Sequence, residues 1–154
     1  MRFRVVRGAL FSPPLGLARS KGDVELRIGA FSEPAVLMGR FDRLCEDFAV
    51  PAFRRATGGR PVHVGEGTLY VGLSLPCVDA LTDATPTSLL NRHVRPILRA
   101  LSLGRKHASY TGRDFVSIGA RPIAALGFAY EEGSGRAVFE AFIAKKTPFA
   151  EGTH

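Results

Sequence analysis

Two adjacent arginines followed by a pair of glycines form the segment of this sequence best suited to chemistry. Arg54 and Arg55 directly precede the run Ala-Thr57-Gly58-Gly59. Neighbouring side chains on a strand face opposite sides, so one guanidinium can point into a pocket and bind a carboxylate or phosphate. The glycines can adopt positive φ, approach a ligand without a Cβ in the way, and leave amides free to meet an anion. The segment predicts a loop that wraps an acyl or acyl-phosphate group; the alternative is a glycine-rich hairpin with surface arginines.

The elements that would position this loop are mostly strands. Alternation and short apolar runs predict strands at 2–6, 24–28, 35–38, 52–56, 61–64, 68–75, 107–111, 115–118 and 123–130, while 137–144 fits either a strand or a helix. One long helix is predicted from a cap at Thr85 to Gly104, with a kink or break at Pro96. A shorter helix is predicted over 41–48. Strands and helices do not alternate regularly, so the fold class is α+β rather than a doubly wound sheet.

Several segments, in the right order, resemble one protein family. The run 54–62, with Tyr70 further on, is similar to the lipoate-binding loop of lipoate–protein ligases. Segment 36–41 resembles the strand and turn that precede this loop in the family. Segment 112–114 resembles the family's segment after the long helix. Segment 123–127 resembles the strand after the family's catalytic lysine, most of all in the related octanoyltransferases. Together these segments identify a short, divergent member of the biotin/lipoate protein ligase family.

The resemblance implies a mixed, mostly antiparallel sheet backed by helices, formed by residues 1–154 as one domain. It places an acyl chain in a tunnel beneath the glycine loop. Ligases of this kind activate lipoate with ATP and Mg²⁺ and pass it to a lysine of a carrier domain, whereas octanoyltransferases use a cysteine and a carrier thioester. Carried over by position, Arg55 would meet the adenylate phosphate or acyl carbonyl, and Thr57, Gly58 and Gly59 would line the acyl site.

Four further residues complete the ligand-binding set that the resemblance implies. Arg113 and Asp114 lie in the segment similar to the one after the long helix. His63 stands one residue before the family's histidine position, and a bulge at 65–67 would be needed to restore its direction. Arg121 neighbours the lysine position but would point to the other face of its strand.

The residues that carry the family's chemistry are replaced in this chain. Pro122 stands at the position of the catalytic lysine, and a proline has no ammonium group to polarise a carbonyl or neutralise a phosphate oxygen. Ser134 stands where the transferase cysteine would be, with glutamates but no histidine nearby to activate it. The sequence therefore leaves open whether the protein is an enzyme.

The chain is also short for the family, which bears on its partners. The helix expected after the first strand is reduced to residues 16–23. Its loss would expose apolar surface of the kind that marks partner sites. We therefore expect a lipoyl-type carrier domain, a companion ligase subunit or a second copy of the chain as partner.

Composition limits the remaining classes of function. The chain has 154 residues and a net charge of +7, which favours acidic partners such as an acyl-adenylate, an acidic carrier domain or nucleic acid. We do not expect nucleic-acid binding, because the basic residues are scattered and aromatic residues on strands are more often core. No apolar run approaches the roughly 20 residues of a membrane span, and no signal peptide is recognisable. Cys45 and Cys77 do not form a disulfide framework, so we expect free thiols and a cytoplasmic protein.

Two hypotheses follow for the function. The first is a lipoate–protein ligase-like or acyltransferase domain that binds lipoate, octanoate or the adenylate, with ATP and Mg²⁺, and receives a missing lysine from Lys145, Lys146 or a neighbouring molecule. The second is a catalytically degenerate binding module or partner subunit of a lipoylation system, which the replaced lysine and cysteine favour. The histidines and cysteines show no metal-ligand spacing, so no resident metal is predicted.

Overall fold

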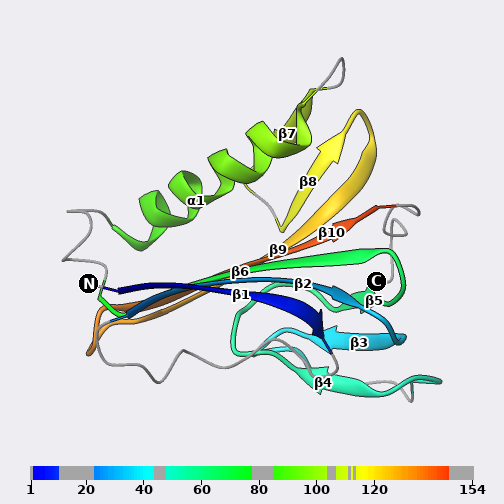
Figure 1. The fold of residues 1–154 in the computed structure, drawn as a ribbon, viewed down its shortest axis with the longest axis horizontal. Coiled ribbons are helices and arrows are strands. Elements are labelled where there is room, and N and C mark those ends of the chain that lie inside the picture. The colour runs from blue at the N-terminus through cyan, green and yellow to red at the C-terminus, as the bar shows by residue number, and fades with distance from the viewer. Residues whose placement is uncertain are drawn as a thin grey trace.

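The computed structural model describes residues 2–10, 23–43, 48–77, 85–103, 107–110, 112 and 114–145; for 2–10, 23, 86 and 87 it describes the backbone alone. Within these ranges the chain forms two sheets and one helix (Figure 1). The strands predicted from sequence are all present, and the stretch 137–144 is resolved as a strand. The fold is α+β, as predicted.

The larger sheet has seven strands in the order β1-β2-β6-β10-β9-β8-β7. These are β1 (Arg2–Leu10), β2 (Asp23–Phe31), β6 (Thr68–Leu75), β7 (Ala108–Tyr110), β8 (Phe115–Ile118), β9 (Arg121–Glu131) and β10 (Arg136–Ala144). The pair β1–β2 is parallel, and the other neighbours are antiparallel. The expected mixed, mostly antiparallel sheet is therefore confirmed.

The smaller sheet has three strands in the order β4-β3-β5: β4 (Ala52–Arg54), β3 (Ala35–Met38) and β5 (Val62–Val64). It packs against one face of the large sheet, and helix α1 (Pro86–Leu101) packs against the other (Figure 1). Successive side chains of β10 point to opposite faces of the large sheet. Phe142 packs in the core under the small sheet, and Phe139 packs in the core under α1.

Helix α1 begins at its predicted cap, where the Thr85 hydroxyl accepts a hydrogen bond from the Ser88 amide. The predicted break at Pro96 is absent, because the helix runs through this residue to Leu101. Pro96 and Arg92 are both exposed, so the carbonyl that loses its intrahelical partner can be hydrated. The helix also ends earlier than predicted, with its C-cap at Ser102; Gly104 lies outside the described residues.

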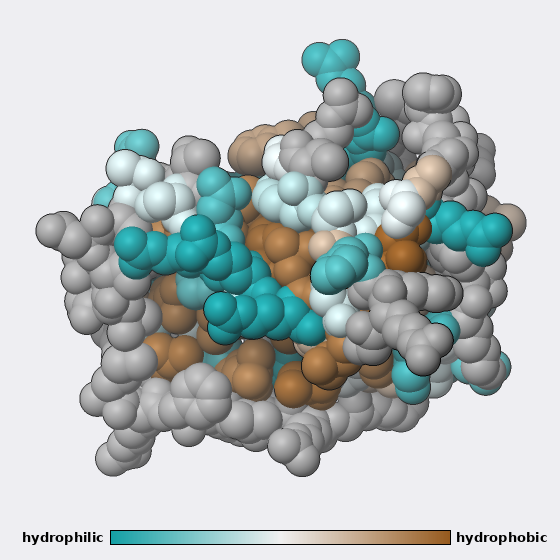
Figure 2. Space-filling view, turned by 90° about the horizontal axis from the view of Figure 1, so that it is seen from above, coloured by the Kyte–Doolittle hydropathy of each residue, from teal (hydrophilic) through white to brown (hydrophobic). Residues whose placement is uncertain are grey.

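The outer face of α1 is strongly basic. Arg92, Arg95 and Arg99 are exposed, and the helix contains no acidic residue. Seen from the α1 side, hydrophilic side chains gather in a band across the molecule, with apolar surface on either side (Figure 2). We call these three residues the arginine ridge.

The helix predicted over 41–48 is not formed by its described residues, since 41–43 and 48 are not helical and 44–47, with Cys45, lie outside the described part. Phe41 is 82% exposed rather than packed on a buried face. The Gly39 amide donates to the Asp42 carboxylate at 2.6 Å, and the Arg54 guanidinium donates to the carbonyls of Gly39, Arg40 and Asp42. These contacts favour a turn over a helix.

The reduced helix predicted at 16–23 also lies outside the described residues, except that Asp23 begins β2. No helix in the described part of the chain is long and apolar enough to cross a bilayer.

Candidate functional site

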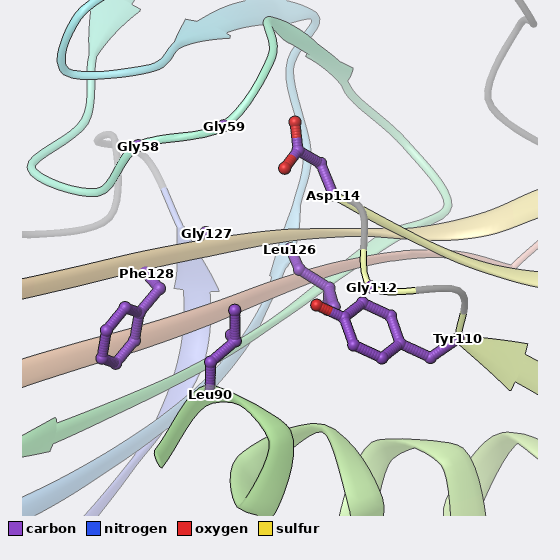
Figure 3. A pocket seen from close by; sticks show the side chains of 9 residues that line it. All are labelled: Gly58, Gly59, Leu90, Tyr110, Gly112, Asp114, Leu126, Gly127 and Phe128. Carbon is purple, nitrogen blue, oxygen red and sulfur yellow. The ribbon is translucent and has the colours of Figure 1, made fainter. Parts of the chain in front are cut away.

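A cavity of about 160 Å³ lies between the glycine loop, β9, the start of α1 and the segment after β7. Its described lining comprises Gly58, Gly59, Leu90, Tyr110, Gly112, Asp114, Leu126, Gly127 and Phe128. Figure 3 shows the side chains of Leu90, Phe128 and Tyr110 converging below the loop, with the Asp114 carboxylate directed towards Gly59. The cavity therefore combines apolar walls with one hydroxyl and one carboxylate.

The loop lies close to the sheet because the glycines have no side chains to keep the two apart. A Cβ on Gly127 would lie 2.3 Å from the Thr57 hydroxyl oxygen, and a Cβ on Gly39 would lie 2.0 Å from the Gly59 carbonyl oxygen. The Gly58 amide donates to the Phe128 carbonyl at 3.1 Å, and Gly59 has a φ of 101°, which favours glycine. The loop thus occupies the space that larger side chains would fill.

Arg55 lies behind the loop and is only 2% exposed, although Arg54 next to it is exposed. Its Nη2 donates to the Arg60 carbonyl at 2.7 Å, and its guanidinium carbon lies 5.2 Å from the centre of the Phe142 ring. Its Nε and Nη1 are buried and have no hydrogen-bond partner among the residues that the structure describes. Burial lowers the pKa of Arg55, and the negative charges of Glu140, Asp42 and Asp114 oppose this effect.

Glu140 lies on β10 beneath the loop and is fully buried. Its carboxylate accepts a hydrogen bond from the Tyr70 hydroxyl at 2.8 Å and another from the Thr57 hydroxyl. Its register partners on the adjacent strands are Gly72 and Gly127, and a Cβ on either would clash with one of these two hydroxyl groups. Glu140 therefore ties Thr57, and with it the glycine loop, to the centre of the sheet.

Burial raises the pKa of Glu140, while the hydrogen bonds from Thr57 and Tyr70 and the charge of Arg55 act in the opposite direction. Burial and the nearby Glu140 charge raise the pKa of Tyr70 as well. Sequence reasoning did not single out Glu140. The available signal was one carboxylate in the otherwise apolar strand AVFEAFIA.

Asp114 and Tyr110 supply the polar groups at the cavity wall. The Asp114 carbonyl accepts a hydrogen bond from the Leu126 amide at 2.7 Å, which holds this segment against β9. Burial and the Asp114 charge raise the pKa of Tyr110, so its hydroxyl remains a donor.

The structure brings together only some of the predicted site residues. Gly58, Gly59 and Asp114 line the cavity, while Arg55 and Thr57 pack behind it. Arg113 lies outside the described residues.

The remaining predicted residues lie away from the lining. His63 is exposed between buried neighbours on β5, and Arg121 is exposed at the start of β9. Pro122, which the sequence predicts at the lysine position, pairs with Ser117 and is half-buried. Ser134 donates to the carboxylate of Glu131 in the turn between β9 and β10.

No family model matches the chain, and no curated protein matches its sequence. Solved structures do match its fold. One is from a study of the bipartite lipoate protein ligase of Thermoplasma acidophilum and its E2 lipoyl domain, with TM-score 0.68 and 19% identity over 83% of this chain and 54% of that one. The fold of a lipoate–protein ligase is thus present.

Two further structures agree. A T. acidophilum structure described as a lipoate protein ligase with bound lipoic acid has TM-score 0.68 and 17% identity over 84% of this chain and 59% of that one. Lipoate-protein ligase A bound with ATP has TM-score 0.63 and 18% identity over 82% and 56% of the two chains. This chain spans little more than half the length of these proteins, and at such identities the likeness shows the fold rather than the activity.

Proposed function

We propose that residues 1–154 form a single domain that binds a lipoyl- or octanoyl-type acyl group, in a system that attaches this group to a lysine of a carrier protein. The proposal rests on the cavity beneath the glycine loop, because apolar walls with few polar groups suit an acyl chain. The fold of lipoate–protein ligases supports it, since one such structure holds lipoic acid. The cavity has a volume of about 160 Å³, similar to cavities that accept a benzene-sized group. It therefore holds only a portion of the acyl chain.

We infer that the domain is catalytically degenerate in isolation. Pro122 stands at the lysine position, and no described residue of the lining is a lysine, arginine, cysteine or histidine. ATP and Mg²⁺ remain predictions from sequence. Among the described residues no cluster of three or more metal-binding side chains exists, and the lining presents a carboxylate where a nucleotide phosphate would need a cation.

The alternative is a non-catalytic partner subunit of a lipoylation system. The bipartite ligase from T. acidophilum is a precedent for dividing such a system between chains. The arginine ridge supports an acidic protein partner, because three exposed guanidinium groups lie on a helix without acids. Leu90 of the same helix lines the cavity, so a carrier domain docked on α1 would lie near the acyl site.

Calorimetric titration tests the acyl site directly. Octanoate, octanamide and lipoamide are titrated into the wild type, with and without ATP and Mg²⁺. We expect saturable binding of an acyl probe that Leu90→Trp abolishes, because the indole fills the cavity. Leu103→Trp is the matched control, since Leu103 is 84% exposed just beyond the helix. Failure of every probe to bind would refute an acyl pocket.

A further inference from the structure

We propose that Glu140 is a positioning residue of the acyl site: it acts through Thr57 to set the place of the glycine loop, and thereby the affinity of the cavity for an acyl group. The inference rests on the proposed function, because it concerns the same cavity. It follows from the groups that hold residues 57–59 against the large sheet.

The hydrogen bond between Thr57 and Glu140 lies directly beside the cavity. The Thr57 hydroxyl donates to the Glu140 carboxylate, and Thr57 is fully buried and lies outside the described lining. The next two residues, Gly58 and Gly59, belong to the lining, on the side of the cavity opposite Leu90 (Figure 3). Consecutive Cα atoms keep a fixed separation, so a displacement of Thr57 moves the cavity wall.

Thr57 provides the side-chain attachment of this loop to the large sheet. Gly58 and Gly59 have no side chain, so they contact the sheet through the backbone, as in the 3.1 Å hydrogen bond from the Gly58 amide to the Phe128 carbonyl. The Thr57 carbonyl accepts a hydrogen bond from the Arg40 amide at 2.9 Å, which ties it to the turn after β3 rather than to the large sheet. Without the hydroxyl bond, backbone contacts alone would hold two conformationally free glycines in place.

The space around Glu140 suits this contact. Its neighbours on the adjacent strands are Gly72 and Gly127, and a Cβ on Gly127 would lie 2.3 Å from the Thr57 hydroxyl oxygen. A Cβ on Gly72 would lie 2.2 Å from the hydroxyl oxygen of Tyr70, the second donor to the carboxylate. Burial of a carboxylate costs free energy that an apolar side chain would not cost, so stability alone does not explain a glutamate at this position. A role in placing the loop does explain it.

Thr57 and Tyr70 offer a matched comparison, because each donates one hydrogen bond to the same buried carboxylate. Thr57→Val and Tyr70→Phe each delete one hydroxyl group and nearly keep the shape of the side chain, so each leaves a Glu140 oxygen without its donor. Only Thr57 belongs to the loop. A purely structural role of Glu140 predicts similar effects of both substitutions on the loop, whereas a positioning role predicts that Thr57→Val displaces it and Tyr70→Phe does not.

Hydrogen exchange of the Gly58 amide, followed by NMR in protein without ligand, measures the placement of the loop. The reference is the amide of Leu73 on β6, a strand that is paired on both sides. We expect Thr57→Val to lower the protection of Gly58 relative to Leu73 at least about tenfold, and Tyr70→Phe to lower it less than about threefold. Thr57→Ser retains the hydroxyl and should restore protection to within about threefold of the wild type.

Calorimetric titration with octanamide then connects the placement of the loop to binding. We expect affinity to fall about tenfold in Thr57→Val and less than about threefold in Tyr70→Phe and Thr57→Ser. If Thr57→Val does not fold, Thr57→Ala is compared with Thr57→Ser, since these two variants differ in the hydroxyl alone.

The outcomes distinguish this inference from the proposed function. Equal losses of Gly58 protection in Thr57→Val and Tyr70→Phe, wild-type protection in Thr57→Val, or no rescue by Thr57→Ser would each overturn the inference. Displacement of the loop with unchanged octanamide affinity overturns it as well but leaves the acyl pocket intact. Failure of every acyl probe to bind the wild type refutes the proposed function, and the effect on affinity falls with it, whereas the exchange data still decide whether Glu140 places the loop.

Discussion

Arg55 and Glu140 are both buried beneath the glycine loop, yet they do not form a direct ion pair. The Glu140 oxygens accept hydrogen bonds from Tyr70 and Thr57, and the Arg55 Nη2 donates to the Arg60 carbonyl. Each charge still influences the pKa of the other. The hydroxyl groups therefore anchor the loop, while the two opposite charges compensate one another at a distance.

Tyr70→Phe should destabilise the protein by about 1–3 kcal/mol, because it leaves an oxygen of the buried Glu140 carboxylate without its donor. The free energy of unfolding, measured with urea, checks this. Tyr130→Phe is the control, since Tyr130 is half-buried with no hydrogen bond to its hydroxyl in the described residues. Equal effects of the two substitutions would show that the Tyr70 hydroxyl does not stabilise Glu140.

Stability should fall as pH rises above the ordinary glutamate pKa of 4.5. The raised pKa of Glu140 means that the folded state binds its proton more tightly than the unfolded state. The corresponding stability is fully present below the unfolded pKa and is lost as pH rises through the folded pKa. Glu140→Gln should flatten this part of the curve of unfolding free energy against pH. An unchanged slope in the variant would contradict the assignment.

Gly127→Ala should displace the loop, because its Cβ would lie 2.3 Å from the Thr57 hydroxyl oxygen and 3.2 Å from the Gly58 carbonyl oxygen. Overpacking of this kind costs about 1–3 kcal/mol. We expect lower thermal stability together with weaker binding of the acyl probe. Gly133→Ala is the matched control, since nothing lies within 4 Å of its Cβ and its φ is not positive. Wild-type stability in Gly127→Ala would count against the tight packing of the loop.

Reversal of one charge in the arginine ridge should weaken binding of an acidic, lipoyl-type carrier domain. Arg95→Glu is expected to reduce the affinity about threefold to tenfold, mainly through slower association, and the effect should shrink as salt is added. Surface plasmon resonance at two salt concentrations measures both quantities. Arg43→Glu makes the same change at an exposed arginine outside α1. A loss of equal size in Arg43→Glu would mean that net charge, rather than the ridge, attracts the partner.

Part of this structure follows from sequence alone, because local patterns determine it. Alternation and short apolar runs predicted strands such as 35–38, 68–75 and 115–118 at their observed bounds. Arg54 and Arg55 were expected to face opposite sides of one strand; Arg55 instead lies just after β4, and it is buried while Arg54 is exposed. The resemblance also predicted the fold, because the motif segments occur in the right order.

Other features depend on contacts between residues far apart in sequence. Phe41 was expected to begin a helix, but the contacts of Arg54 with the backbone around it favour a turn. Pro96 was expected to break α1, but its exposed position lets water satisfy the freed carbonyl. In each case the surroundings outweighed a local preference.

The chemical character of the site was decided by tertiary structure. In sequence, Glu140 is one acid in an apolar strand, 83 residues from Thr57. Only strand pairing sets it between Gly72 and Gly127, where space remains for the two hydroxyl groups that bind it. Sequence determined which groups are present, whereas folding determined that Asp114 lines the cavity and Arg55 lies behind it, because charge at a site depends on which side chains converge there.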